Sequence, residues 1–426
     1  MFFGTAKAII TPHIPMELAC TGVFGENFID IHDDTYVRCL VLDDGTEKIV
    51  LMSFDLLFHD RMLNEKIAEY AFEKYDIKPE NIIVSYTHSH TAAAGRGYNP
   101  GAENAEYEAE LLFNAKRCVD RALCSMIEGT LEYCSFECDF NISRRGIIDG
   151  VFRNAPNPDY DRDTEFFVMC LRDIGGEVRS VLMNYGCHPV FYPASLSVSG
   201  EFPARVCQLL DTEYYGSTSL FFQSAGGDVR PKPTAGGDGR FINSLPFSVV
   251  DRFAKEIADS VKTAIEGGNM KKTELSMKVN AFEIPLEMEP KPLEYFDNMH
   301  NAYGNAMHPE SRNARAITKE VYSQLKKELL LHCQAVRLAD ELYLVSMGGE
   351  PCCRVKKAVK ETFDGKNLLF IGYTDACAYI VDDRMLDEGG YESGCHLEYG
   401  LIGPFKKGLD KIYTESFKKA FEEIKN

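Results

Sequence analysis

Residues 81–97 read NIIVSYTHSHTAAAGRG, and this stretch decides our interpretation of the fold. The apolar run Ile82–Val84 predicts a short buried strand, and His88 and His90 follow at its end. Residues two apart in an extended chain point to the same face, so both imidazoles can contact the same bound ion or ligand. Neutral imidazole is the commonest metal-ligating side chain, which makes a metal site one interpretation. Two histidines hydrogen-bonded at a loop mouth are the other.

Composition bounds the class of protein. The chain has 426 residues, with 45% hydrophobic and 26% charged residues, which is typical of a soluble globular protein with a sizeable core. This length allows one large domain or two to three ordinary ones. The 46 basic and 65 acidic residues give a formal charge of −19. Such a surface repels polyanions, so we expect neither a nucleic-acid partner nor electrostatic docking on anionic lipid.

The compartment is inferred from the N-terminus and the cysteines. The first fifteen residues, MFFGTAKAIITPHIP, lack the charged start and apolar core of a secretory signal. No apolar run approaches the roughly 18 residues that span a bilayer. The 14 cysteines are scattered, which favours free thiols over a disulfide framework. We therefore predict a cytoplasmic protein without stable membrane insertion.

Strand and helix patterns alternate along the chain. Extended segments are expected within 1–56 and at 82–84, 131–143, 164–173, 179–189, 219–228, 274–286, 342–350 and 368–380. Amphipathic helices are expected at 60–76, 102–129, 204–216, 246–268, 317–330 and 405–424, with irregular chain at 287–315. The alternation predicts an α/β fold, with a mixed parallel and antiparallel sheet flanked by helices on both faces. No linker or repeat interrupts it, so we expect one domain over 1–426.

Several of the expected strands end in polar side chains. In α/β folds, ligands bind where the carboxyl ends of strands leave the sheet, so these side chains are expected to converge on one pocket. They are Asp55, His88, His90, His188, Ser224, Glu350 and Tyr379. Among them, His88, His188 and Glu350 would supply two imidazoles and one carboxylate, a ligand set known from zinc hydrolases.

Each candidate also has a structural interpretation. His188 could be a core histidine beside Pro189, and Glu350 could be a first-turn acid of the helix after Pro351. Ser224 lies in QSAGGDVRP, where a glycine turn could expose its hydroxyl and offer backbone N–H groups to an anion.

Ser224 could equally belong to a tight turn in which Asp228 acts as a cap or pairs with Arg230. Arg144 and Arg145, in the loop-like NISRRG, could clamp a carboxylate or carbonyl, or could be solvated surface. These alternatives stay open at the level of the sequence.

Taken together, the motifs resemble those of the neutral (alkaline, non-lysosomal) ceramidase family, specifically its catalytic domain. The matching segments follow the family's order and span nearly the whole chain. They are AKAIITP (6–12), YTHSH (86–90), NISRR (141–145), NYGCHP (184–189), SGEFPA (199–204), FFQSAGGDVRP (221–231), GGEP (348–351) and GYTDACAYIVDDRMLDEGGYE (372–392).

The resemblance implies a zinc ion and assigns roles to the residues around it. It implies that zinc is held by His88, His188, Glu350 and Tyr379. It moves His90 from the ligand set, where the spacing argument places it, to a position beside the substrate carbonyl as an oxyanion partner. It implies substrate contact by Arg144, although Arg145 could take that place, and it places Ser224 near the scissile amide.

Two departures from the family pattern bear on the substrate. The family's THTHSGPGG stands here as THSHTAAAG, so the pocket loop differs. We also expect neither a secretory signal nor the additional C-terminal β domain of the family ceramidases. We therefore expect a zinc-dependent hydrolase that cleaves the C–N bond of an N-acylated small molecule or lipid-like amide. The alternatives are a metal-free serine esterase built on Ser224 and His90, and a non-catalytic zinc-containing binder of small molecules.

Overall fold

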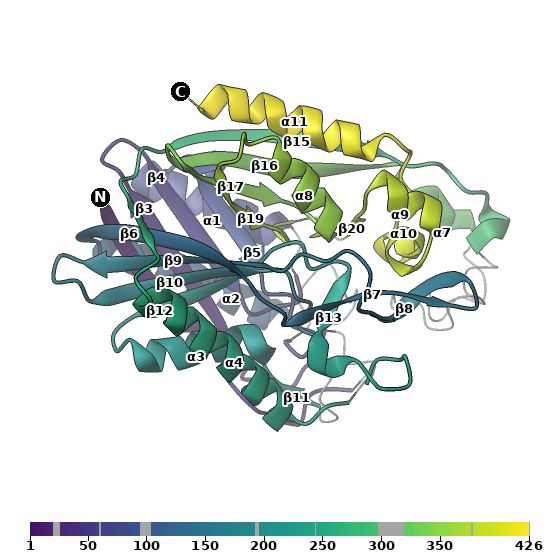
Figure 1. Cartoon of the computed structure of the whole chain (residues 1–426), viewed down its shortest axis with the longest axis horizontal. Helices are drawn as coiled ribbons and strands as arrows, with labels where there is room; N and C mark the ends of the chain where they lie inside the picture. The colour runs from purple at the N-terminus through teal and green to yellow at the C-terminus, as the bar shows by residue number, and fades with distance from the viewer. Residues whose placement is uncertain are drawn as a thin grey trace.

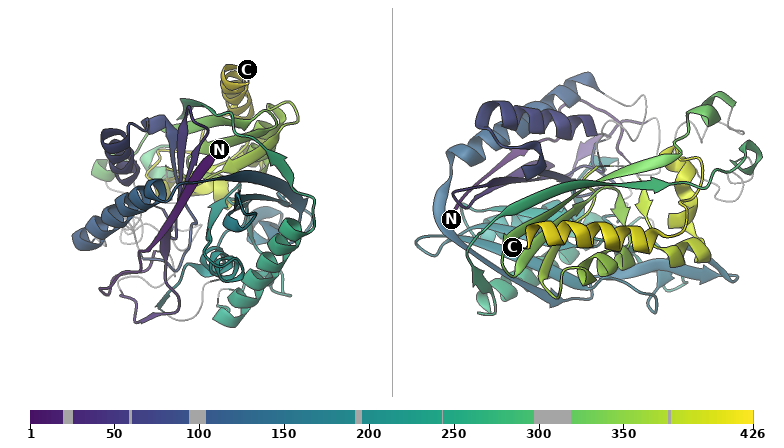
Figure 2. Two further views of the ribbon diagram at one scale, coloured as in Figure 1. Left: turned by 90° about the vertical axis from the view of Figure 1, so that its left-hand side faces the viewer. Right: turned by 90° about the horizontal axis from the view of Figure 1, so that it is seen from above.

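The computed structural model describes residues 1–19, 26–58, 61–93, 104–191, 196–242, 244–296, 319–375 and 378–425 (Figure 1). Two β-sheets pack face to face, and helices cover the outer face of each (Figures 1 and 2). The α/β class with mixed strand directions is confirmed. The strands are divided between two sheets, whereas the sequence predicts one.

The first sheet has nine strands in the order β12-β10-β9-β6-β1-β3-β4-β5, with β14 beside β6. The pairs β4–β5 and β10–β12 are parallel and the others are antiparallel. Its strands are β1 (Phe2–Ile9), β3 (Tyr36–Asp43), β4 (Lys48–Phe54), β5 (Ile82–Tyr86), β6 (Ile127–Glu137), β9 (Glu165–Asp173), β10 (Val178–Tyr185), β12 (Thr218–Gln223) and β14 (Lys271–Thr273).

The second sheet has the order β15-β16-β17-β19, with only β17–β19 parallel. Its strands are β15 (Lys278–Glu287), β16 (Glu328–Ala339), β17 (Leu342–Met347) and β19 (Asn367–Ile371). Alternate apolar residues of the two sheets meet in a shared core. Leu40, Leu51 and Phe222 of the first sheet lie there with Leu344 and Leu369 of the second.

Helices bury one apolar face each against these sheets. α1 (Arg61–Tyr75) and α2 (Ala105–Cys124) cover the β1–β5 part of the first sheet, and α3 (Glu201–Glu213) and α4 (Phe247–Glu266) cover its β9–β12 part. α8 (Cys353–Glu361) and α11 (Leu409–Ile424) cover the second sheet. The Asn104 side chain caps α2 by accepting from the N–H groups of Glu106 and Tyr107.

Three small sheets add the remaining strands; β13 lies just after β12 in the chain, and β18 just after β17. The sheets are β13-β7-β8, β18-β20 and β11-β2. Their bounds are β2 (Asp30–Ile31), β7 (Asn141–Ile148), β8 (Val151–Asn157), β11 (Ser197–Val198), β13 (Val229–Pro231), β18 (Glu350–Pro351) and β20 (Tyr379–Ile380). Short helices complete the chain: η1 (Pro79–Asn81), η2 (Lys232–Thr234), α7 (Lys319–Gln324), α9 (Asp383–Glu388), α10 (Tyr391–Gly394) and η3 (Cys395–Tyr399).

Some predicted segments were wrong. The helix predicted at 102–129 ends at Cys124, and its last residues begin β6. The segment interpreted as a polar loop after residue 143 forms the β7–β8 hairpin. The helix predicted at 317–330 is only α7, followed by β16, and the strand predicted at 368–380 is split into β19 and β20. Of the irregular segment 287–315, residues 297–315 lie outside the described residues.

Two further predictions concern the whole chain. Every cysteine in the described ranges is a free thiol, as predicted. No helix among the described residues is long and apolar enough to cross a membrane. The single-domain assignment over 1–426 stays a prediction.

Candidate metal and active site

His88 is placed by the end of β5. The backbone N–H of Thr87 still donates to Phe54 O (2.8 Å), and that of His88 donates to Leu56 O (2.9 Å). His88 then takes φ +66°, in the left-handed region that a non-glycine residue seldom adopts. This conformation ends the strand and turns the imidazole inward; the side chain is almost fully buried. Such local strain concentrates at functional sites.

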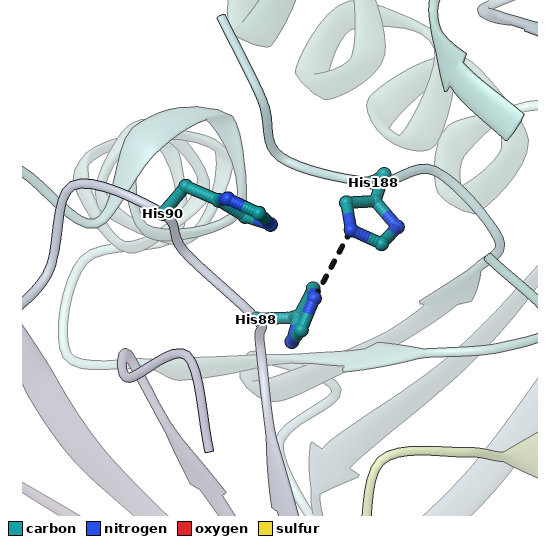
Figure 3. Close-up of side chains that lie close together, drawn as sticks. All are labelled: His88, His90 and His188. Carbon is teal, nitrogen blue, oxygen red and sulfur yellow. Dashed lines mark hydrogen bonds between the residues drawn. The ribbon is translucent and has the colours of Figure 1, made fainter. Parts of the chain in front are cut away.

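His88 and His188 face each other across the interior (Figure 3). Their Nε2 atoms lie 3.0 Å apart. The Nδ1 of His88 lies 2.9 Å from Leu57 O, and the Nδ1 of His188 lies 3.1 Å from Gly226 O. A carbonyl oxygen can only accept, so each Nδ1 is the protonated nitrogen of its ring. When both rings are neutral, their Nε2 atoms are lone-pair acceptors that point at each other.

Glu350 adds a third acceptor. Its Oε2 lies 3.4 Å from His88 Nε2 and 3.7 Å from His188 Nε2, and has no hydrogen-bond partner among the described residues. Burial raises the pKa of Glu350, but a positive charge on the His88 ring, the Arg144 guanidinium and a hydrogen bond from Tyr399 outweigh it and hold that pKa below its ordinary value. Glu350 is therefore a buried carboxylate.

The charge state of His188 completes this picture. Burial lowers its pKa well below the ordinary value, and the positive charge of Arg144 lowers it further. The ring is thus neutral at neutral pH, as a metal-ligating imidazole must be.

His90 belongs to the same cluster, since one ligand atom from each of His88, His90 and His188 fits within a 4.8 Å separation. The His90 ring centroid lies 5.0 Å from that of His88 and 5.1 Å from that of His188. The sequence predicts that His88 and His90 lie close together, and the structure confirms this. Whether His90 ligates or contacts substrate stays a prediction.

This donor set fits a zinc ion. Ligands about 2.0–2.1 Å from a tetrahedral zinc lie roughly 3.3 Å from one another. The three separations among His88 Nε2, His188 Nε2 and Glu350 Oε2, 3.0, 3.4 and 3.7 Å, bracket that value. Three converging acceptors without a donor between them are unfavourable unless a cation or proton lies there. The described residues supply no such donor to the Oε2 atom of Glu350.

Two glycines allow Glu350 to reach the cluster. Gly349 has φ +77°, and a Cβ there would lie 2.6 Å from the Ile380 side chain. A Cβ on Gly227 would lie 2.5 Å from Glu350 O. The turn after β12 therefore packs directly on β18, and the N–H of Gly227 donates to Pro351 O (2.9 Å). Larger residues at these positions would push the carboxylate away from the histidines.

Three tyrosines surround Glu350. Tyr379 is its register partner in the parallel pair β18–β20, so their side chains lie on the same face. The structure brings Tyr379 to the site in this sense, while its ligation of a metal stays a prediction. Tyr399 donates its hydroxyl to Glu350 Oε1 (2.9 Å), and the Tyr373 ring lies 4.8 Å from the His88 ring. Sequence reasoning missed these two, because their signal is only a tyrosine among apolar neighbours.

Consecutive arginines of β7 point in different directions. The register of β7 against β8 shifts between Ser143 and Arg145, which makes Arg144 the irregular residue. Its guanidinium lies over the Tyr379 ring at 4.9 Å, and its Nη2 is buried without a hydrogen-bond partner among the described residues. Arg144 therefore lies at the site and retains an unused donor.

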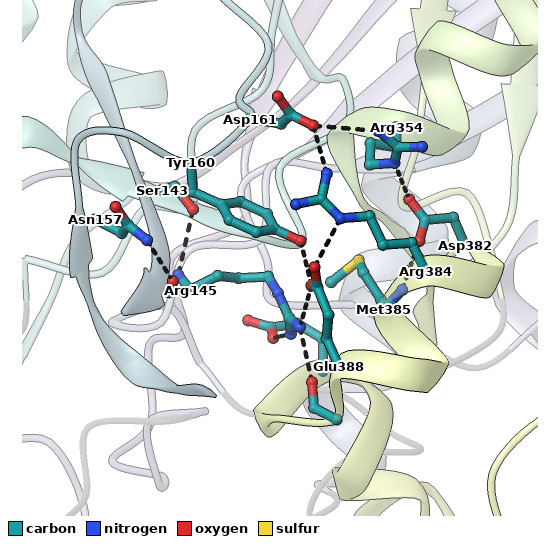
Figure 4. Close-up of polar contacts among 12 residues, drawn as sticks. Ser143, Arg145, Asn157, Tyr160, Asp161, Arg354, Asp382, Arg384, Met385 and Glu388 are labelled. Carbon is teal, nitrogen blue, oxygen red and sulfur yellow. Dashed lines mark hydrogen bonds and ion pairs between the residues drawn. The ribbon is translucent and has the colours of Figure 1, made fainter. Parts of the chain in front are cut away.

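Arg145 serves the surrounding structure (Figure 4). Its side chain is fully buried and pairs with Glu392 (2.7 Å) and Glu388 (3.1 Å), and it donates to Gly389 O (2.7 Å). Tyr160 donates to the same Glu388 carboxylate (2.5 Å), and Arg384 pairs with its other oxygen (2.7 Å). This network fixes α9 and α10 to the β7–β8 hairpin. Of the two arginines, Arg144 is the one near the candidate ligands.

Ser224 follows the last residue of β12, as predicted. It is fully buried, and its Oγ has no hydrogen-bond partner among the described residues. Asp228 accepts from the N–H of Cys353 at the start of α8 (2.9 Å), so this carboxylate acts as a cap from outside the helix. Burial raises the pKa of Asp228 to about 7.

Asp55 was expected at the pocket but lies elsewhere. Its Oδ2 pairs with the buried Arg38 at 2.6 Å and accepts from the N–H of Tyr36. Asp55 therefore supports the first sheet. The altered loop after His90 is described only as far as Ala93, and Ala94–Gly97 lie outside the described residues.

No protein-family model and no curated protein sequence matches the chain. Among solved structures, the neutral ceramidase of Pseudomonas aeruginosa matches with a TM-score of 0.76 at 16% identity, over 99% of this chain and 74% of that one. A ceramidase complexed with C2 matches equally well, also with a TM-score of 0.76 and 16% identity, over 99% of this chain and 75% of that one.

At this identity the likeness concerns the fold, and it extends over nearly all of the present chain. It agrees with the ordered motifs that led to the same family from the sequence. The protein therefore has the fold of the neutral ceramidases.

Proposed function

We propose that this protein is a zinc-dependent hydrolase of linear amide bonds, acting on an N-acylated small molecule or a lipid-like amide. The observation that carries the proposal is the convergence of three buried acceptors: Nε2 of His88, Nε2 of His188 and Oε2 of Glu350. The fold shared with a neutral ceramidase supports amide hydrolysis as the reaction class.

In this proposal His88, His188 and Glu350 hold the ion, with Tyr379 as the fourth ligand. Leu57 O and Gly226 O fix the two imidazoles in the tautomer that ligation requires. A zinc ion held there supplies Lewis acidity, which polarises a carbonyl and acidifies water.

The remaining residues bind and orient the amide. Arg144 offers its unused Nη2 and His90 its imidazole to the oxygen that becomes negative during hydrolysis. A single donor of this kind typically contributes about 10²–10³ in rate. Burial of these groups excludes water and strengthens each interaction.

Metal content tests the proposal. The wild type, His188→Ala and His13→Ala are purified without added metal and measured by elemental analysis. His13 is the matched control, since its side chain is half exposed and pairs with Glu106 and Glu110, away from the cluster. About one zinc per chain is expected in the wild type and in His13→Ala, and none in His188→Ala. Absence of metal from all three folded proteins would overturn the zinc proposal.

Activity is then tested on a panel of N-acyl amides with different acyl chains and amines. Hydrolysis by the wild type that is lost on chelation and restored by zinc supports the function. A zinc-loaded protein that binds these amides without turnover would instead be a small-molecule binder.

One observation favours a second route. The Ser224 hydroxyl is buried and unpartnered among the described residues, so it is available to attack a substrate or to orient water. A metal-free serine esterase built on Ser224 and His90 predicts activity that survives chelation and an acyl-enzyme on Ser224. Rapid quenching followed by mass spectrometry detects that adduct, and its absence during single turnover would exclude the covalent route.

A further inference from the structure

The β7–β8 hairpin ends in an apolar tip. Ile147, Ile148 and Val151 are 59%, 41% and 45% exposed, on a chain whose formal charge is −19. Asp149 and Gly150 form the turn with φ values of +52° and +77°, the conformation of a tight two-residue hairpin. The tight turn at the tip therefore keeps these aliphatic side chains exposed to solvent. Single exposed apolar residues need no explanation, but a cluster does.

The tip is apolar on both faces. Ile147 pairs with Phe152 and Ile148 pairs with Val151 across the hairpin. Consecutive residues of a strand point to opposite faces, so each face carries one apolar pair. A hairpin that docks on another protein needs one apolar face, with the other polar and solvated. Apolar side chains on both faces of the turn suit shallow contact with a fluid apolar layer, while the exposed Asp149 and Arg153 limit how deeply the hairpin enters it.

The hairpin is continuous with the candidate site. Arg144, which lies over the Tyr379 ring, is on the same strand as Ile148. Four residues of strand span roughly 14 Å. Figures 1 and 2 show the hairpin extending beyond the body of the molecule on the side of α9 and α10. The buried network of Arg145, Glu388 and Glu392 fixes its base to these helices.

From these observations we infer that the β7–β8 tip inserts shallowly into the surface of a neutral or zwitterionic lipid assembly and thereby brings the site to lipid-borne amides. That the tip delivers lipid-borne amides to the site rests on the proposed function. Binding of the tip to a lipid surface does not depend on turnover. The described ionisable residues of the tip, Asp149 and Arg153, carry opposite charges. Binding is therefore apolar in origin, and the strongly acidic protein disfavours anionic lipid.

The absence of tryptophan from the chain provides a direct probe. Ile148→Trp places a single tryptophan at the tip. Ile174→Trp is the matched control: Ile174 is 82% exposed and lies in the connection between β9 and β10, two strands of the first sheet. With phosphatidylcholine vesicles, the emission of Ile148→Trp is expected to shift to the blue, and that of Ile174→Trp to stay unchanged. No shift in either variant, or equal shifts in both, would overturn the inference.

Loss of binding is tested with the double variant Ile147→Ser/Ile148→Ser. Its substitutions are exposed, so circular dichroism and thermal unfolding are expected to match the wild type. Each lost isoleucine is expected to weaken vesicle binding about tenfold in a sedimentation assay. Replacing part of the phosphatidylcholine by phosphatidylserine should weaken wild-type binding at low salt. Concentration-dependent self-association through the tip, without vesicle binding, would overturn the inference in favour of a protein interface.

Hydrolysis separates this inference from the proposed function. A short-chain, water-soluble amide is expected to be cleaved equally by the wild type and the double variant, and an amide embedded in vesicles much more slowly by the variant. Cleavage of the soluble amide without vesicle binding would overturn the lipid inference alone. Vesicle binding without cleavage of any amide would overturn the proposed function alone.

Discussion

The Nε2 atoms of His88 and His188 lie 3.0 Å apart, although each ring already donates its Nδ1–H to a backbone carbonyl. Without a cation or an added proton between the two Nε2 atoms, this contact forces one ring to give up its carbonyl or leaves two lone pairs opposed. Ion binding removes this conflict, so the folded state is expected to gain stability from it.

We expect zinc at about 1,000 times its dissociation constant to raise the free energy of unfolding by about 4 kcal/mol. Denaturant titration with zinc and with a chelator measures this difference. The same titration on His188→Ala is expected to show no zinc effect. Equal stabilisation of the variant would mean that zinc binds elsewhere.

Tyr399 orients Glu350 and is expected to tune the ion without touching it. Tyr399→Phe removes the 2.9 Å hydrogen bond to Glu350 Oε1, and a lost supporting contact of this kind costs about 10–100-fold in metal affinity. Competition with a chromophoric chelator measures this loss. Tyr413→Phe is the matched control, because among the described residues the buried Tyr413 hydroxyl donates to Val381 O and to no group of the cluster. Similar affinities in both variants would contradict an orienting role.

Arg145 is expected to matter for stability. Arg145→Met leaves Glu392 and Glu388 without one of their partners in a buried setting, which costs about 3–5 kcal/mol. The exposed Arg153 of the neighbouring strand serves as control, and Arg153→Met is expected to cost less than about 0.5 kcal/mol. Chemical denaturation compares the two. A loss below about 1 kcal/mol for Arg145→Met would contradict the structural role.

Ser224→Ala is expected to separate chemistry from stability. The Ser224 hydroxyl has no partner among the described residues, so its removal leaves no group unpaired, and the free energy of unfolding should change by less than about 1 kcal/mol. If the hydroxyl acts on substrate or water, kcat falls by about 100-fold or more while zinc content is kept. Steady-state kinetics with elemental analysis checks both. Unchanged kcat would remove Ser224 from the mechanism.

His396 is expected to make folding sensitive to acid. Burial lowers the pKa of this ring from 6.5 to about 4. The unfolded chain therefore binds more protons than the folded one between these values, and stability falls as pH falls through that window. Between pH 7 and pH 5, this one group removes about 2 kcal/mol.

Urea denaturation at the two pH values tests His396→Phe against the wild type. The variant keeps an aromatic ring beside Tyr295, with which His396 stacks. It is expected to lose about 2 kcal/mol less than the wild type over this interval. Equal losses would show that His396 titrates normally in the folded protein.

Local signals explain what the sequence could predict. The runs that end at His88, Ser224 and Glu350 are short, apolar and bounded by turn residues. Each of these strands can therefore be predicted from its own local sequence pattern. Their meeting follows from the rule that strand ends form the site. The resemblance to the family favoured Arg144 but left Arg145 open, and the structure places Arg144 near the candidate ligands.

Pairing and long-range contacts explain what the sequence could not predict. The β7–β8 hairpin contains Asn, Asp, Arg and Pro and has no alternating pattern, so composition alone indicates a loop. The division into two sheets depends on which strands pair, which no local pattern encodes. Tyr399 reaches Glu350 from 49 positions further along the chain, a contact fixed only by tertiary packing.

The positions of the three candidate ligands have a consequence for the order in which the protein folds and binds its ion. His88 and His188 follow strands of the first sheet and lie one hundred positions apart, and Glu350 follows β17 of the second sheet. No single hairpin or βαβ unit of the chain contains the site, so an ion cannot nucleate folding here as it does in a zinc finger. It can only be captured once both sheets have docked. From then on it would cross-link them, and separating the sheets would require the ion to leave first.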